Sequence, residues 1–252
     1  MNKYTNIADY YDSLTDYYDL LMTQGYYDYQ GMANAVYSLI KDGRKKILEL
    51  GVGTGLFAEK LLALAPEAEF TGVDITLSML NIARQRLGEW GNLVEADIYN
   101  MNLQETFDIA VSSRGVWVIS QRGDQTDLRN HTKDIDEDIK GLINVAKHLR
   151  QDGLFMLSIQ GEHKSYQQNL PTGIVYSQEI EKIGENDEIK SIEKTYFFQR
   201  DGEILAQQKL KLNYIKQWKK EEIMEQAGFS FVGIDESKKF HNLSQKVKQI
   251  IK

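Results

Sequence analysis

The sequence predicts an α/β fold in which a mostly parallel, seven-stranded sheet is flanked by helices. Short apolar segments typical of buried strands alternate with segments of helical periodicity, and a glycine-rich turn joins the first strand to a helix. Period-two patterns between residues 172 and 216 add an antiparallel β insertion after the fifth strand. With 252 residues, the chain is long enough to bury a full core.

The glycine-rich turn lies within residues 47–62. Gly51, Gly53 and Gly55 separate the first predicted strand from a helix that starts near Leu56. Glycines at alternate positions permit positive φ and let backbone N–H groups approach a ligand closely. Because Leu56 stands where a dinucleotide fingerprint has its third glycine, the turn does not fit that fingerprint.

An acidic residue narrows the choice of ligand. Glu49 lies inside the strand, just before the first glycine. A carboxylate beside backbone donors repels a pyrophosphate but favours a ligand that carries an ammonium group beside a carboxylate. S-adenosylmethionine is such a ligand. The alternative is a glycine turn that only packs a helix on the sheet.

With its form acidic-x-Gly-x-Gly-x-Gly, the segment resembles the first motif of the class I S-adenosylmethionine-dependent methyltransferases of the small-molecule N-/O-methyltransferase type. The resemblance covers nearly the whole chain and implies a Rossmann-like class I methyltransferase fold. It also implies S-adenosyl-L-methionine as the cofactor and S-adenosyl-L-homocysteine as the product.

The next two predicted strands also end in acids. Asp74 ends the second strand, where a Rossmann-like sheet places the acid that accepts the ribose hydroxyls; the alternative is a cap for the following helix. The resemblance assigns Asp97, at the end of the third strand, to the adenine amino group and the backbone N–H of Ile98 to a ring nitrogen. Met79 matches an apolar contact to adenine, with core packing as its alternative. The predicted cofactor contacts are Tyr11, Tyr18, Glu49, Gly51, Gly53, Gly55, Asp74, Ile75, Met79, Asp97, Ile98 and Ser113.

Most of the chain's 14 tyrosines precede the first predicted strand, at helical spacing. The segment resembles the family's opening pattern Tyr-x-x-x-Ala-x-x-Tyr-Asp-x-x-Met, except that Thr15 replaces the alanine. The resemblance implies that Tyr11 contacts the amino-acid end of the cofactor and that Tyr18 lies close to the reacting methyl group. A packing face is the alternative. The matching residues are Tyr11, Tyr18, Asp19 and Met22.

The residues that bind the substrate are predicted to lie in the loops after the fourth and fifth strands. Related enzymes often carry a histidine pair in the first of these loops, where this chain has Trp117 and Val118. Trp117 is predicted as a wall of the substrate pocket, with a core position as the alternative. The fifth strand leads into Gln160 and His163, which we expect to face the substrate because ligands bind beyond the carboxyl ends of parallel strands.

Methyl transfer is an in-line displacement for which alignment supplies ~7–11 kcal/mol, so a strong base is optional. Because the histidine pair is missing, we favour an amine acceptor over a hydroxyl. His163 and Tyr18 are the predicted catalytic residues, and Glu162 is another possible base. The alternatives are O-methylation of a hydroxyl or carboxyl, a same-fold enzyme that uses the cofactor without methyl transfer, and a non-enzymatic binding subunit.

Composition argues against several other functions. Lys and Arg total 30 against 37 Asp and Glu, and the net charge of −7 comes without a basic cluster, so we expect no nucleic-acid partner. The chain has no cysteine, and its 4 histidines lack metal-motif spacing, so we expect no metal. Without a membrane-length apolar run or a signal-peptide pattern, a cytoplasmic protein is expected.

The predicted organisation has four segments. The insertion resembles those that roof the active site and form a dimer contact in related enzymes, so a homodimer is among the expected assemblies. The expected acceptor is a small molecule such as an amino sugar or another specialised metabolite. Residues 121–138 are expected to form an exposed polar loop. The segments are residues 1–42 (an aromatic helical lid), 43–171 (the cofactor-binding core), 172–216 (the antiparallel insertion covering the active site) and 217–252 (the C-terminal part of the core).

Overall fold

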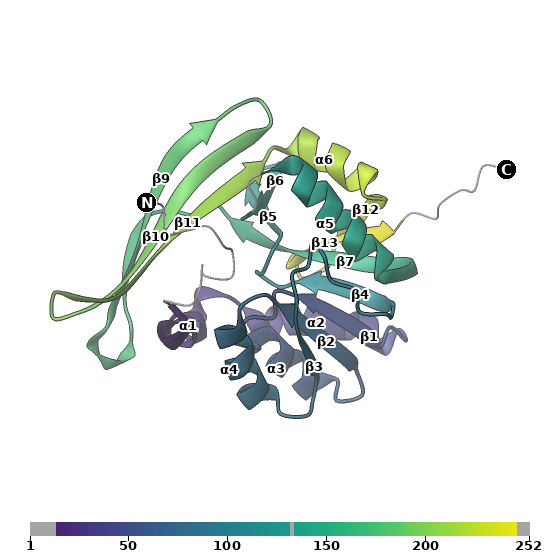
Figure 1. Cartoon of the computed structure of the whole chain (residues 1–252), viewed down its shortest axis with the longest axis horizontal. Coiled ribbons are helices and arrows are strands. Elements are labelled where there is room, and N and C mark those ends of the chain that lie inside the picture. The colour runs from purple at the N-terminus through teal and green to yellow at the C-terminus, as the bar shows by residue number, and fades with distance from the viewer. Residues whose placement is uncertain (1–13, 132–133, 246–252) are drawn as a thin grey trace.

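A computed structural model describes residues 14–131 and 134–245 (Figure 1). The centre of the protein is a sheet whose neighbouring strands are parallel from β3 through β2, β1 and β4 to β7. Two antiparallel strands, β13 and β12, continue it beyond β7. The strands are β1 (Lys46–Leu50), β2 (Glu69–Asp74), β3 (Asn92–Glu95), β4 (Phe107–Ser112), β7 (Leu149–Gly161), β12 (Phe229–Ile234) and β13 (Phe240–Gln245).

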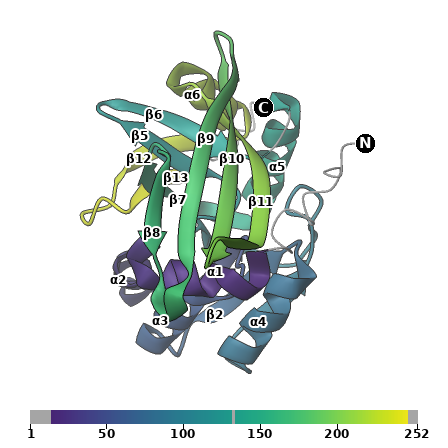
Figure 2. The same ribbon diagram turned by 90° about the vertical axis from the view of Figure 1, so that its left-hand side faces the viewer.

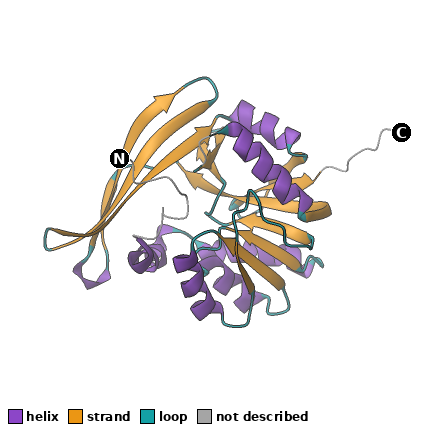
Figure 3. Ribbon diagram, viewed as in Figure 1, coloured by secondary structure: helices purple, strands orange, loops and turns teal. Residues whose placement is uncertain are grey.

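Helices cover both faces of this sheet (Figure 3). Successive residues of β1 point to opposite faces, so Ile47 packs with α2, α3 and α4 while Leu48 packs with α5 and α6. Phe57 and Val145 are among the buried side chains that the two sets of helices contribute. The helices are α2 (Tyr29–Lys41), α3 (Leu56–Leu64), α4 (Leu77–Leu87), α5 (Ile135–Lys147) and α6 (Gln217–Gln226).

An antiparallel extension grows from the end of β7 and projects away from the helices (Figures 1 and 2). It belongs to the same sheet, which has 13 strands in the described residues, seven in the central part and six in the extension. The predicted hairpin is present, with Asp201 and Gly202 at positive φ in its turn. The extension consists of β5 (Val118–Arg122), β6 (Gln125–Asn130), β8 (Tyr166–Asn169), β9 (Val175–Glu185), β10 (Ile189–Arg200) and β11 (Glu203–Ile215), with a short 3-10 helix, η4 (Pro171–Gly173), before β9.

The expected polar loop at residues 121–138 is instead occupied by parts of the β5–β6 hairpin and of α5, separated by a short connection. Leu128 pairs with Ile215 and Asn130 with Asn213, so β6 joins β11 to the part of the extension that starts with β5. Leu128 and Asn130 are both buried. The polar composition of this stretch did not reveal that tertiary pairing would bury it.

The first described helix lies between the extension and the central layers (Figures 1 and 2). Helix α1 (Thr15–Leu21) runs into a π-helical turn, η3 (Met22–Tyr26). Leu21 packs with Leu56 on one side and with Leu210 of the extension on the other. Tyr17 stacks on Phe198 with ring centroids 5.2 Å apart. The N-terminal segment therefore connects the extension to the glycine-rich part of the sheet. None of the described helices is long and apolar enough to span a membrane.

Candidate active site

A cavity of about 300 Å³ lies at the carboxyl ends of β1, β2 and β4. Its wall combines the glycine-rich turn, the strand ends and residues of α1 and α2. This is the edge of an open α/β sheet at which ligands bind. The wall includes Tyr18, Glu49, Gly53, Asp74, Asp97 and Arg114.

The glycine-rich turn adopts the geometry expected from its sequence. Gly51, Gly53 and Gly55 have φ values of 73°, 54° and 82°, which side chains rarely adopt. A Cβ atom on Gly51 would lie 3.0 Å from the Gly115 Cα atom, whereas one on Gly53 would point into open space. Gly51 and Gly53 line the cavity; Gly55 precedes α3 and packs near Leu87 instead. A ligand can therefore approach the backbone at Gly53.

Glu49 provides an uncompensated acid in the cavity wall. Its side chain is buried, and the Ser113 hydroxyl donates a hydrogen bond to Oε1. The second oxygen, Oε2, has no hydrogen-bond partner among the described residues. Burial, with a smaller contribution from Asp74, raises the pKa of Glu49 well above its usual range. A ligand that offers a cation or a donor would stabilise this carboxylate.

Asp74 ends β2, which lies beside β1, and Asp97 follows β3, which lies beside β2. Asp74 accepts backbone N–H bonds from Gly53 and Thr76, each at 2.8 Å, so it joins the glycine turn to the start of α4. Burial raises the pKa of Asp74 despite these bonds. Asp97 accepts a 3.0 Å bond from the Tyr99 N–H. The structure brings the three predicted acids to one cavity, which Ile75, Met79, Ile98 and Ser113 also line.

Two lid tyrosines lie on the cavity wall. Tyr18 of α1 is one of them, as predicted, and Tyr29 of α2 lies within hydrogen-bonding reach of it. Burial raises the pKa of Tyr29, so its hydroxyl is protonated at neutral pH. Tyr11 lies outside the described residues. The lid therefore contributes phenol groups opposite the acids.

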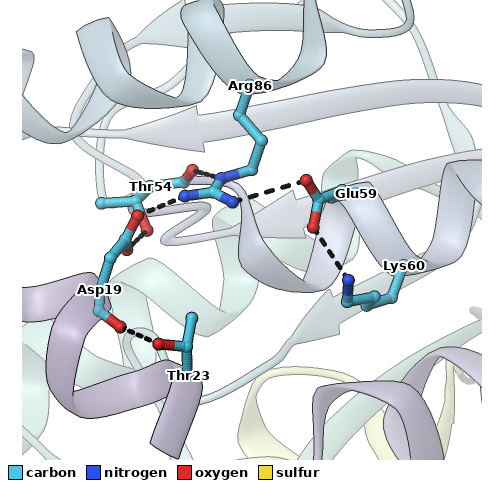
Figure 4. A network of polar contacts seen from close by, with 6 residues as sticks. All are labelled: Asp19, Thr23, Thr54, Glu59, Lys60 and Arg86. Carbon is cyan, nitrogen blue, oxygen red and sulfur yellow. Dashed lines mark hydrogen bonds and ion pairs between the residues drawn. The ribbon is translucent and has the colours of Figure 1, made fainter. Parts of the chain in front are cut away.

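A polar network ties α1 to the glycine turn (Figure 4). The Thr54 hydroxyl donates a 2.6 Å hydrogen bond to Asp19, and Arg86 of α4 forms an ion pair with the same carboxylate. Arg86 Nε also donates to the Thr54 carbonyl at 2.8 Å. Glu59 and Thr23 extend the network to α3 and along the lid. These contacts hold α1 against the glycine turn and α4.

Comparison with known proteins agrees with this geometry. Residues 47–133 match the family described as "Methyltransferase domain". Residues 47–133 therefore carry a methyltransferase domain. The family and fold class predicted from the sequence are thereby confirmed.

Individual relatives of this methyltransferase share parts of the chain or its fold. Malonyl-[acyl-carrier protein] O-methyltransferase of Anoxybacillus flavithermus is 30% identical over 159 residues, which are 61% of this chain and 53% of that protein. The chain thus spans about half the length of the curated relatives it matches. An S-adenosylmethionine-dependent methyltransferase from Clostridium acetobutylicum has a TM-score of 0.66 at 19% identity, with 94% of this chain and 99% of that chain covered.

A second solved structure has the same fold. The S-adenosylmethionine-bound CalS10, an amino pentose methyltransferase from Micromonospora echinaspora, has a TM-score of 0.66 at 14% identity. The comparison covers 91% of this chain and 96% of that chain. At these identities, the two structures show a shared fold.

The predicted substrate residues lie away from the cavity wall of the methyltransferase. Trp117 is completely buried, and its indole N–H donates a 2.7 Å hydrogen bond to Asp138. Its ring packs edge-on against Phe155 in the core, 6.2 Å between centroids. Of the two interpretations of Trp117, the structure therefore selects the core position, because α5 supplies a buried carboxylate for the indole.

Gln160 and His163 lie in a basic cluster beneath the extension. Arg129 donates a 2.7 Å hydrogen bond to Gln160 and also contacts His163. The Lys194 Nζ atom lies 3.3 Å from His163 Nδ1. Burial, followed by the charges of Arg129 and Lys194, lowers the pKa of His163 far below its usual value. At neutral pH the imidazole is neutral and a weak base, so its surroundings do not favour the predicted role in catalysis.

The cavity also includes residues that the sequence did not single out. Arg114 follows β4 directly, where its position at a strand end was a usable signal. His131 falls within residues 121–138, which were expected to form an exposed loop, yet it lines the cavity. Burial and the charges of Arg129 and Lys194 lower the pKa of His131 to about 3. No local pattern around His131 indicated this burial.

Proposed function

We propose that this protein is an enzyme that transfers a methyl group from S-adenosylmethionine to a small molecule. The main observation behind this proposal is that Glu49, Asp74 and Asp97 line one cavity. This cavity lies beside a glycine turn with open space at Gly53. The methyltransferase domain and the S-adenosylmethionine-bound CalS10 neighbour support this proposal. The unpartnered Glu49 oxygen and the open approach to Gly53 fit the cofactor's ammonium group and extended shape.

In this proposal, different residues of the cavity bind different parts of the cofactor. Glu49 faces the cationic part of the cofactor, and Asp74 accepts bonds from the ribose hydroxyls. Asp97 and the Ile98 N–H bind the adenine edge, and Met79 packs against the ring. When bound, the cofactor supplies an activated methyl group; the protein orients both reactants and excludes water.

Tyr18 lies on the cavity wall and can orient the acceptor through its hydroxyl. We retain the amine acceptor as the first choice, because no histidine with a near-neutral pKa lies at the cavity. Transfer to a carboxyl oxygen is the second choice, because a carboxylate needs no base and Arg114 is available to bind it.

The four-segment organisation, the covering role of the extension, a homodimer and a cytoplasmic location are part of this proposal. They rest on the sequence pattern and the family resemblance. The position of α1 between the extension and the cavity supports a lid role for the N-terminal segment.

Calorimetry with S-adenosylhomocysteine tests the cofactor site. We expect a micromolar dissociation constant, about −8 kcal/mol, and at least tenfold weaker binding for Asp74→Asn. Asp152→Asn, in an exposed position on the far side of β7, is the matched control and should bind like the wild type. Absence of binding by the folded wild type would overturn the proposal.

A labelled cofactor tests the reaction. With methyl-labelled S-adenosylmethionine and panels of small amines and carboxylic acids, label should move to one class of acceptor. Cofactor breakdown without labelled product would instead identify a same-fold enzyme that does not transfer methyl groups.

A further inference from the structure

Besides the acids, the cavity wall contains basic residues, and we call this part of the wall the basic end. Arg114 and His131 form part of its wall, and Arg129 and Lys194 lie behind them. Arg129 is 6% exposed and Lys194 is fully buried. Burying cations without nearby anions is costly, so a protein that keeps several together has a reason beyond stability.

Aromatic groups of the described residues contact two of these cations, Arg114 and Lys194. The Arg114 guanidinium lies over the Tyr27 ring at 4.8 Å. Lys194 lies over Tyr196 at 4.3 Å and donates to the Tyr26 hydroxyl at 2.9 Å. Such rings stabilise a cation but leave its charge uncompensated.

Two carboxylates near the cluster in the described part of the chain are already paired with lysines. Asp28 feels the charge of Arg114, but it pairs with Lys239 at 2.7 Å. Glu162 pairs with Lys190 at 2.9 Å. Among residues 14–131 and 134–245, Arg114 Nε and Nη1 have no hydrogen-bond partner. Two donors of one guanidinium are therefore without a described partner in a residue that lines the cavity.

We propose that the methyl acceptor carries an acidic group, carboxylate or phosphate, which Arg114 binds with the support of the buried Arg129 and Lys194. The planar guanidinium can donate two parallel hydrogen bonds to such a group. An acidic group offsets the buried positive charge, whereas a purely cationic acceptor would be repelled. This inference rests on the proposed function and names the chemical class of its substrate.

The two ends of the cavity then bind different reactants, the cofactor and the methyl acceptor. The acids face the cofactor, and the basic end faces the acceptor. The acidic group of the acceptor is either the nucleophile itself or a handle beside it. In both cases it anchors the acceptor in one orientation, which is what in-line transfer requires.

The test uses the protein saturated with S-adenosylhomocysteine and titrated calorimetrically at low salt with malonate, inorganic phosphate or ethylenediamine. We expect malonate or phosphate to bind at least tenfold more tightly than ethylenediamine, and the stronger of the two identifies the acidic group. Arg114→Gln should weaken anion binding at least tenfold, about 1.4 kcal/mol, while changing the affinity for S-adenosylhomocysteine less than twofold.

Matched variants separate this site from general charge effects. Lys194→Met should weaken the anion about fivefold, while Lys190→Met, on the same strand but paired with Glu162, should not. If Lys194→Met does not fold, Arg114→Lys should bind with intermediate affinity, because it keeps the charge but loses the paired donors.

Two results would overturn the inference. In one, neither anion binds more tightly than ethylenediamine to the cofactor-loaded protein. In the other, Arg114→Gln weakens S-adenosylhomocysteine and leaves the anion unchanged, which would assign Arg114 to the cofactor's own carboxylate. Failure of S-adenosylhomocysteine to bind the wild type would instead count against the proposed function.

Discussion

The acidic and basic ends of the cavity are assembled in different ways. Glu49, Gly53 and Asp74 come from consecutive elements, and a backbone hydrogen bond joins the last two directly. Arg114 and Lys194 come from the end of β4 and from β10, far apart in the chain. The acidic end follows from the order of strands in the sheet. The basic end exists because β10 of the extension brings Lys194 close to His163 and His131.

The first way to test this contrast is to fill the acidic end. Gly53→Val places a β-branched side chain at a φ of 54° and in the open space of the cavity, so we expect at least 100-fold weaker S-adenosylhomocysteine binding. Gly123→Val is the matched control, because Gly123 has a φ of 59° and open space in the β5–β6 turn. Calorimetry should show normal binding for the control. Equal losses of S-adenosylhomocysteine affinity in both variants would mean that backbone strain causes the loss. Filling of the cavity by the valine side chain would then not be the cause.

The second test removes charge from the acidic end without changing its shape. Glu49→Gln should weaken S-adenosylhomocysteine about tenfold or more, because the amide cannot compensate an ammonium group. Glu95→Gln alters an exposed carboxylate at the end of β3 and should leave affinity unchanged. The measurement is the dissociation constant from calorimetry. Unchanged affinity in Glu49→Gln would remove Glu49 from the cofactor site.

The third test addresses the basic end through pH. The pKa of His163 is lowered in the folded protein from its ordinary value of 6.5, so below pH 6.5 the unfolded chain binds the additional proton. Stability from this residue is present above pH 6.5 and is lost as pH falls, by at most ~1.4 kcal/mol per pH unit. His163→Gln should reduce that slope between pH 6.5 and 4.5 in urea unfolding. Gln167→Ala, an exposed neighbour, should keep the slope of the wild type.

A slope that is the same in His163→Gln and the wild type would mean that His163 is not held neutral in the folded protein. Neither the burial of His163 nor the charges of Arg129 and Lys194 would then lower its pKa. The wild-type slope also contains opposing contributions from buried acids such as Asp74, so the comparison rests on the difference between variants.

The smallest expected effect concerns the connection of the lid to the acidic end. Asp19→Asn weakens the ion pair to Arg86 but keeps a bond to Thr54, so stability should fall by less than about 1 kcal/mol. Cofactor affinity should fall two- to fivefold if α1 helps to cover the site. Asp16→Asn, an exposed change on the same helix, is the control. Equal affinities for the two variants would show that the lid contributes nothing to cofactor binding.

Much of the fold was predictable because its signals are local. Glycines at positions that need positive φ, and acids at successive strand ends, can be read from neighbouring residues. The hairpin around Asp201 and Gly202 was found for the same reason. The polar stretch that forms β6 was not found, because its burial depends on pairing with β11.

The sequence by itself determined the strand–glycine turn–helix unit, the order of the parallel strands and the acids that meet at their ends, since backbone conformation and strand order fix these positions. Only the tertiary structure decided that Trp117 lies in the core and that His131 lies at the cavity. It also decided that Arg114 and Lys194 belong to one basic region. These placements depend on contacts between segments distant in the chain, and no local periodicity records such contacts.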